Sequence, residues 1–245
     1  MRMRLDQLLV ERKLFQSRAK AQAAILAGKV KLVGCERPTA GKQVAEDALV
    51  HLEPDPVPFV SRGGLKLAAA LDAFGVNPAG RTALDLGAST GGFTDCLLKR
   101  GALRVWAVDV GRSQLDASLR SDPRVANLER THARELAPDR LGPPPERPDL
   151  AVVDVSFISL AKVLAYIPPC LKPPFEILAL VKPQFEVGPK KAPKGVVRKE
   201  EYRKEALENV RAAARRVSLI ERGWMDCPVH GPKGNVEYFL YLTGP

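Results

Sequence analysis

The sequence predicts an α/β fold, in which a Rossmann-like seven-stranded sheet follows a small α+β domain. After residue 60, short apolar strands alternate with helical segments, a pattern typical of a doubly wound sheet. Before residue 54, two helices are followed by two strands. Between the two patterns, three prolines within residues 54–58 favour a stiff extended connector. We therefore predict domains over residues 1–53 and 61–245, joined by a linker over 54–60.

In the first domain, apolar residues at helical spacing predict the first helix, around residues 5–9. Ser17 is a suitable N-cap for a second helix, and Gly28 lies where a C-cap glycine is expected. Alternating apolar residues predict strands at 30–33 and 48–52, with a turn at Gly34.

In the second domain, Ser61 can cap a helix that ends at Gly75. Apolar runs then predict five strands, and a long charged helix covers about residues 200–216. Two last strands complete the seven. The seven predicted strands cover residues 83–86, 105–108, 125–128, 150–153, 177–181, 219–224 and 236–242.

The chain is basic, with 38 Lys and Arg against 28 Asp and Glu, a net charge of +10 and a pI near 9.6. Residues 1–31 and residues 182–222 each carry a local excess of six positive charges. This excess favours a polyanionic partner, nucleic acid first and an anionic membrane surface second. The longest apolar runs span about five residues, far below the roughly 20 that a transmembrane helix needs.

The charges near the N-terminus and the spacing of the cysteines indicate where the protein is located and whether it binds a metal. Charged residues break up any signal-peptide core near the N-terminus, so we expect a cytoplasmic protein. The four cysteines are scattered without a Cys-x-x-Cys pair, which indicates thiols in a reducing compartment and no metal site.

The first domain resembles the αL RNA-binding module shared by the ribosomal protein S-four, several pseudouridine synthases and some tRNA synthetases. Residues 4–9, residues 17–21, Ile25 and residues 28–30 carry this resemblance. It implies docking on structured RNA through phosphates and shape, although a solvated helix face is the alternative for its charges. The candidate RNA-binding residues are Arg4, Arg12, Lys13, Arg18, Lys20 and Lys29.

A loop of small residues follows the first strand of the second domain and predicts a cofactor site. It does not fit the G-x-G-x-x-G pattern of dinucleotide sites, and the acidic strand end at Asp85 suits a cationic cofactor such as S-adenosylmethionine. Asp109 ends the next strand, about 22 residues after Gly87, where an acid binds ribose hydroxyls. An adenine edge would lie near His132, although His132 could equally be a packing residue. The candidate cofactor residues are Asp85, Gly87, Ala88, Ser89, Thr90, Gly91, Gly92, Phe93, Asp109, His132 and Ala133.

Four charged residues occupy functional positions of such a sheet: Lys66, Asp154, Lys182 and Glu237. Each alone could be a solvated strand end, but charges at the carboxyl edge of parallel strands meet at the cleft. Methyl transfer from a sulfonium to a ribose hydroxyl requires alignment and removal of the hydroxyl proton. We predict Lys182 as the proton acceptor, Lys66 as the neighbouring cation that favours its neutral form, and the two carboxylates as orienting groups.

These four residues and the loop over 85–93 resemble the FtsJ/RrmJ class of ribose 2′-O-methyltransferases. The fusion to an αL module, with the segments 61–67, 154–159, 181–187 and 234–239, is similar to the TlyA family, whose members also carry the name haemolysin. The resemblance implies an rRNA cytidine 2′-O-methyltransferase that binds ribosomal RNA or a ribosomal subunit. The end of the chain at Pro245 implies modification of large-subunit 23S rRNA more than of 16S rRNA.

Competing functions are less consistent with the motifs. An amine methyltransferase would carry two prolines after Asp154, and a carbon-5 methylase would carry a cysteine after the fourth or fifth strand. The non-enzyme alternatives are an RNA-binding assembly factor with a vestigial cofactor pocket and a cytolysin. We expect neither a membrane nor DNA as a partner, and the oligomeric state stays open.

Overall fold

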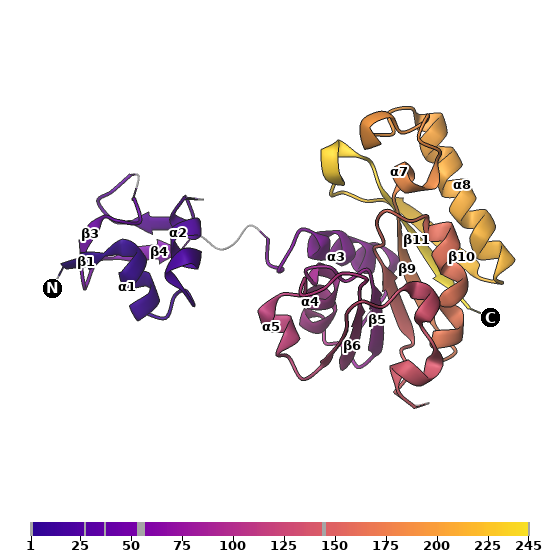
Figure 1. Cartoon of the computed structure of the whole chain (residues 1–245), viewed down its shortest axis with the longest axis horizontal. Helices are drawn as coiled ribbons and strands as arrows, with labels where there is room; N and C mark the ends of the chain where they lie inside the picture. The colour runs from indigo at the N-terminus through magenta and orange to yellow at the C-terminus, as the bar shows by residue number, and fades with distance from the viewer. Residues whose placement is uncertain (1, 27, 37, 53–56, 144–145, 245) are drawn as a thin grey trace. The chain divides into compact units, whose positions relative to one another are not determined.

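The computed structural model describes residues 2–26, 28–36, 38–52, 57–143 and 146–244. The chain divides into two compact units, Met1–Pro58 and Phe59–Pro245 (Figure 1). Each unit has its own hydrophobic core. Residues 53–56, which include most of the predicted proline connector, lie outside the described residues.

The first unit packs two helices against short strand pairs. Strand β1 pairs with β3 and β2 pairs with β4, both antiparallel. The sequence did not predict β1 and β3, because three residues are too few to show an alternating pattern. The fourth strand is also shorter than expected. The elements are β1 (Arg2–Arg4), α1 (Leu5–Glu11), α2 (Arg18–Leu26), β2 (Val30–Leu32), β3 (Gln43–Ala45) and β4 (Val50–Leu52).

Both ends of α2 follow the sequence prediction. The backbone N–H of Lys20 donates to Ser17 Oγ at 3.3 Å, which is an N-cap contact. Gly28 adopts a left-handed φ of 73°, and its N–H donates to the carbonyl of Ile25. The chain therefore leaves the helix through a residue that bears no Cβ penalty in this conformation.

The second unit contains a seven-stranded sheet in the order β10-β11-β9-β8-β5-β6-β7, which confirms the predicted fold class. Strands β5 to β9 run parallel, and β11 inserts antiparallel between β9 and β10. The strands are β5 (Thr82–Leu86), β6 (Arg104–Val108), β7 (Val125–Leu128), β8 (Leu150–Val153), β9 (Glu176–Val181), β10 (Ile220–Asp226) and β11 (Tyr238–Thr243).

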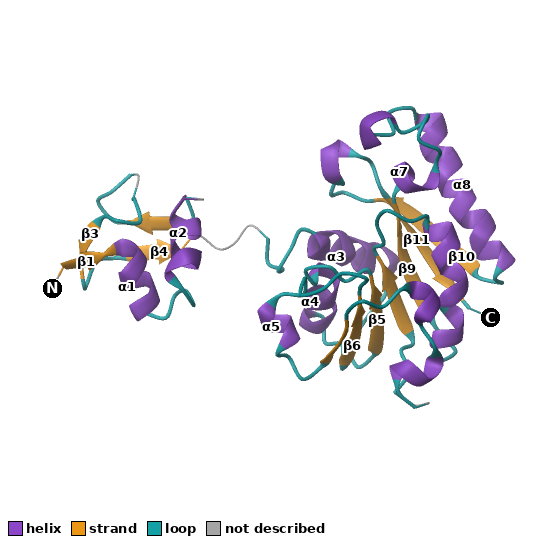
Figure 2. Ribbon diagram, viewed as in Figure 1, coloured by secondary structure: helices purple, strands orange, loops and turns teal. Residues whose placement is uncertain are grey.

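Helices cover both faces of this sheet (Figure 2). Buried residues of α3, α4 and α5 pack with one face, and those of α6 and α8 pack with the other. The order of strands reverses beside β5, where open α/β sheets bind ligands. The helices are α3 (Gly63–Phe74), α4 (Gly92–Lys99), α5 (Ala117–Arg120), α6 (Leu160–Val163), α7 (Pro183–Glu186) and α8 (Glu200–Arg216). Short 3-10 helices lie at Ala133–Glu135, Pro138–Leu141, Leu164–Tyr166, Pro168–Cys170, Pro193–Gly195 and Pro232–Gly234.

Several predicted boundaries in the second unit shift by one or two residues. The N-cap of α3 is Arg62, while Ser61 Oγ accepts a hydrogen bond from Gly63 N at 3.3 Å. The last strand begins at Tyr238, so Glu237 precedes it. At the other end of α3, Gly75 is the left-handed C-cap that the sequence predicted. Within the described part of the chain, none of the helices has the length and apolarity that crossing a membrane requires.

Candidate active site

The loop between β5 and α4 is packed so closely at its glycines that a side chain at these positions would clash. Gly87 has a φ of 89°, and a Cβ there would lie 2.6 Å from the carbonyl oxygen of Asp154. A Cβ at Gly92 would lie 2.2 Å from Ser61 Oγ. These glycines bring the ends of β5 and β8 and the starts of α3 and α4 together, so the predicted cofactor loop and the segment from Ser61 onward form one site.

Two neighbouring cavities open at this edge of the sheet. The first, of about 600 Å³, contains both predicted lysines and is called the lysine cavity. The second, of about 530 Å³, is called the Asp109 cavity. Both are lined by Gly87, Ser89 and Asp154, so they meet at the glycine loop. Of the predicted cofactor residues, the lysine cavity is lined by Gly87, Ala88, Ser89, Thr90, Gly92 and Phe93, and the Asp109 cavity by Gly87, Ser89, Asp109, His132 and Ala133.

Each lysine of the lysine cavity faces a carboxylate. Lys66 Nζ donates to Glu237 Oε2 at 2.5 Å, and both side chains are buried. Lys182 Nζ lies 2.5 Å from Asp154 Oδ1 in an ion pair and donates to Ser156 Oγ at 2.7 Å. The sequence analysis predicted the two carboxylates as orienting groups and Lys66 as a cation that neighbours Lys182. Opposite charges pair here because a buried ammonium is costly without a counter-charge.

The position of Glu237 depends on its neighbours. A Cβ at Gly231 would lie 2.1 Å from Glu237 Oε1, so only glycine allows this loop to cover the carboxylate. Arg62 holds the same loop by donating to the carbonyl of His230 at 3.1 Å. Arg62, His230 and Gly231 all line the lysine cavity, and the sequence analysis missed them as site residues. The Arg-Gly-Gly run before Lys66 was the available signal for the first of them.

Asp109 is held at the mouth of its cavity by two backbone donors. Its carboxylate accepts hydrogen bonds from Ser89 N at 2.8 Å and from Gly111 N at 2.7 Å. His132 caps the short helix that follows β7, and its N–H donates to Glu135 Oε2 at 3.1 Å. The cavity is also lined by residues that sequence reasoning missed, among them Val110, Gln114, Thr131 and Phe157.

Asp85 and Gly91 differ from the other predicted cofactor residues, because neither lines these two cavities. Asp85 is fully buried, with Thr94 Oγ1 donating to its Oδ2 at 2.6 Å. Its Oδ1 has no hydrogen-bond partner among the described residues. Burial, supported by the nearby charges of Asp154 and Asp109, raises the pKa of Asp85 to about 7. Asp85 therefore lies beneath the loop, outside both cavities.

The raised pKa of Asp85 predicts a pH-dependent stability. The folded pKa of about 7 exceeds the ordinary aspartate value of 3.8, so the stabilising contribution is complete below about pH 4 and is lost as the pH rises through 7. Relative to the wild type, Asp85→Asn should gain up to about 4 kcal/mol of unfolding free energy between pH 4 and pH 8. Urea unfolding of both proteins at the two pH values measures this difference. If the unfolding free energies of the two proteins differ by the same amount at pH 4 and pH 8, the raised pKa of Asp85 is contradicted.

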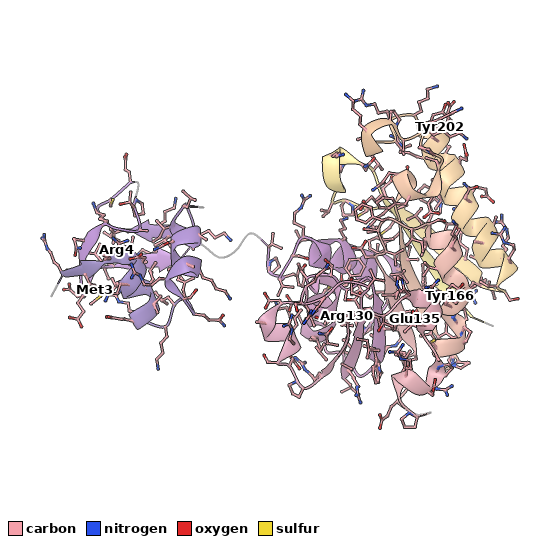
Figure 3. The ribbon with its side chains drawn as sticks, in the orientation of Figure 1. Met3, Arg4, Arg130, Glu135, Tyr166 and Tyr202 are labelled. Carbon is pink, nitrogen blue, oxygen red and sulfur yellow. The ribbon has the colours of Figure 1, made fainter. Side chains whose placement is uncertain are left out.

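Most of the predicted RNA-binding residues in the first unit have structural partners. Arg4, labelled in Figure 3, donates to both oxygens of the buried Asp6 at 3.1 Å. Arg18 Nη2 donates to the same carboxylate at 3.1 Å, and Gln22 donates to it at 2.6 Å. These hydrogen bonds, Arg4 first, hold the pKa of Asp6 well below its usual range.

Of the other predicted cations of the first unit, Arg12, Lys13 and Lys20 are exposed at the surface and Lys29 is half-buried. Arg12 donates to the carbonyls of Glu46 and Ala48, and Lys20 donates to Gln16 Oε1 at 2.8 Å. Lys13, with a left-handed φ of 56°, and Lys29 complete the set. The first unit therefore carries basic side chains at its surface, and two of them, Arg4 and Arg18, are held in place by the buried carboxylate of Asp6.

Comparison with known proteins gives consistent relatives over nearly the whole chain. A 16S/23S rRNA (cytidine-2′-O)-methyltransferase TlyA of Mycobacterium tuberculosis is 48% identical over 98% of this chain and 90% of that protein. Hemolysin A of Brachyspira hyodysenteriae is 36% identical over 98% of this chain and 99% of that protein. A solved structure from Streptococcus thermophilus, provisionally named a hemolysin, has a TM-score of 0.75 and 36% identity, covering 99% of this chain and 88% of that one.

The family models agree with these relatives. Residues 3–32 match the S4 domain, and residues 59–243 match the FtsJ-like methyltransferase. The second match covers more than half of the chain, and the whole-length relatives include TlyA proteins. The chain therefore belongs to the TlyA family, with an S4 domain followed by an FtsJ-like methyltransferase domain.

Proposed function

We propose that this protein transfers a methyl group from S-adenosylmethionine to the ribose 2′-hydroxyl of a cytidine in ribosomal RNA. The observation that carries the proposal is the lysine cavity, in which Lys66–Glu237 and Lys182–Asp154 pairs meet the glycine loop. Relatives of this chain are named for this reaction on 16S/23S or on 23S rRNA. The reaction would take place in the cytoplasm, where ribosomal RNA is found.

The residues present fit the proposed cofactor. S-adenosylmethionine carries two cationic groups and a ribose diol, and it supplies a methyl group on a sulfonium. The buried Oδ1 of Asp85, which has no hydrogen-bond partner among the described residues, would be stabilised as a carboxylate by a cationic group bound above the loop. The Asp109 carboxylate would accept from the ribose hydroxyls, and the half-buried walls near Val155 and Ala133 would contact the adenine.

Lys182 would accept the proton of the 2′-hydroxyl in its neutral amine form, after releasing its own proton to solvent. Its amine enters the lysine cavity from the end of the buried strand β9, and Ser156 and Asp154 fix its direction. Lys66 adds a second positive charge, held in place by Glu237, that stabilises the oxyanion as the hydroxyl loses its proton. The chain therefore aligns the acceptor oxygen and removes its proton, which is what this transfer requires.

The first unit would supply RNA affinity through the fixed guanidinium groups of Arg4 and Arg18. Asp6→Asn removes one negative charge and so raises the net charge of the chain by one. Charge alone would therefore strengthen RNA binding. If Asp6 orients the two arginines, the variant should instead bind ribosomal RNA on the order of 10-fold more weakly, because two long side chains must be ordered on binding. Filter binding at fixed salt measures the affinity.

The matched control for this prediction is Glu11→Gln. Glu11 is an exposed carboxylate on α1. Its replacement raises the net charge by the same amount and leaves Asp6 unchanged. This control should bind RNA as tightly as the wild type or slightly more tightly. Circular dichroism checks that both variants are folded. Equal affinities of the two variants would show that Asp6 does not position the arginines.

The proposed function is tested by methylation of separated ribosomal subunits and of free rRNA with labelled S-adenosylmethionine. Digestion to nucleosides followed by mass spectrometry should identify 2′-O-methylcytidine. The label on a base atom would overturn the reaction class. RNA binding without any S-adenosylmethionine binding in calorimetry would indicate an assembly factor, and absence of both would favour the cytolysin alternative. Comparing the subunits also tests the expectation of 23S rRNA.

A further inference from the structure

A third cavity, of about 440 Å³, lies beside the proposed catalytic lysine. It shares Phe157 and Ile158 with the Asp109 cavity. It is also lined by Gln184 and Phe185, which follow Lys182 by two and three residues in the sequence. A group bound in this third cavity would therefore lie next to the Asp109 cavity and against the chain segment that follows the residue proposed to take the proton.

Two aromatic rings, Phe157 and Phe185, line the third cavity, and the segments that carry them are joined by hydrogen bonds. Phe157 is 93% exposed and has a left-handed φ of 62°, a conformation that is rare for a bulky residue and is typical of functional positions. Its ring centroid lies 5.4 Å from that of Phe185. Glu186 joins the two segments by accepting from Ser159 Oγ and Leu160 N, both at 2.7 Å. An exposed ring beside a half-buried one suits a planar ligand such as a nucleobase.

Gln184 supplies an unused polar group to this cavity. Its Oε1 is buried and has no hydrogen-bond partner among the described residues. A buried acceptor without a donor is unfavourable, and a ligand that brings a donor to it removes that cost. The amide also carries a donor nitrogen beside the oxygen, so it can form two adjacent hydrogen bonds with the edge of a base.

We propose that the third cavity binds the base of the target nucleotide and that Gln184 reads its Watson–Crick edge. In this arrangement Oε1 accepts from the exocyclic amino group of cytosine, and Nε2 donates to ring atom N3. Uracil has a carbonyl oxygen in place of that amino group, and this oxygen would face and repel Oε1 in the amide orientation that the structure shows, with Oε1 on the buried side. The inference rests on the proposed function and adds to it the residue that selects cytidine over uridine.

The test compares two substrates with two enzymes. After the methylated position has been mapped with the unmodified protein, transcripts are made with cytidine or uridine at that position, and kcat/KM is measured for each. The wild type should prefer cytidine by about 5- to 150-fold, the discrimination expected of a bidentate contact. Gln184→Ala should lower the rate on cytidine and bring the ratio of the two rates close to one. Gln184→Glu keeps an acceptor but no donor, so it should methylate cytidine slowly and retain the preference.

A structural role for Gln184 predicts a different result. Asn209→Ala is the control, because Asn209 Nδ2 supports α7 from α8 by donating to the carbonyl of Glu186 at 3.3 Å. That variant should lower both rates together and leave their ratio unchanged. The same unchanged ratio in Gln184→Ala, or equal wild-type rates on both transcripts, would overturn the assignment of Gln184. Failure of the wild type to form any 2′-O-methylnucleoside would instead overturn the proposed function and the inference with it.

Discussion

Lys182→Arg should lower single-turnover methyl transfer to ribosomal RNA by about 100- to 10,000-fold, the usual contribution of a positioned general base. Arginine keeps the positive charge that faces Asp154, but its guanidinium does not lose a proton in proteins and cannot accept one from a ribose hydroxyl. Calorimetry should show that S-adenosylmethionine binding is retained, since Asp85 and Asp109 are unchanged. Labelled-methyl transfer in a single turnover measures the chemical step directly.

Lys172→Arg is the matched control for this substitution. Lys172 is on the surface beside Asp149, which precedes the start of β8, at the opposite edge of the sheet from Lys182. The Lys172→Arg variant should therefore retain a near-native rate of methyl transfer. A near-native rate in Lys182→Arg would show that another group accepts the proton.

Removing residues 1–58 should abolish methylation of ribosomal RNA while leaving cofactor binding intact. The deleted unit contains residues 1–31, with their excess of six positive charges, and the fixed pair Arg4 and Arg18. The remaining unit has its own cores on both faces of the sheet and should fold alone. Calorimetry with S-adenosylmethionine and the labelled-methyl assay separate the two activities.

Salt dependence provides an independent check on the role of the first unit. For the full chain, log affinity for RNA should fall with log salt concentration, with a slope of about −0.7 to −0.9 for each phosphate neutralised. The shortened chain should show a smaller slope. Full methylation activity after the deletion, or an affinity of the full chain that does not change with salt, would contradict an RNA-binding role for the first unit.

Much of the fold could be predicted because its signals are local. The central strands are continuous apolar runs, such as residues 177–181, and they end at charged residues that belong to the cleft. Gly28 and Gly75 mark helix ends because only glycine adopts their left-handed conformation without cost. Strands β1 and β3 escaped prediction because three-residue strands have no readable period. Cavity-lining residues such as His230 escaped because a lone histidine in a loop carries no motif.

The sequence by itself determined which residue types could carry the chemistry, since the glycine loop, the basic blocks and the four charged residues are all visible in it. Only the tertiary structure decided how the charges pair. Lys66 and Glu237 lie 171 positions apart and meet because β11 inserts beside β9, with Tyr238 opposite Val181. Burial likewise separates Asp85, which lies beneath the loop, from Asp109, which lines a cavity. Desolvation and counter-charges depend on which distant segments pack together, and a local pattern does not contain that information.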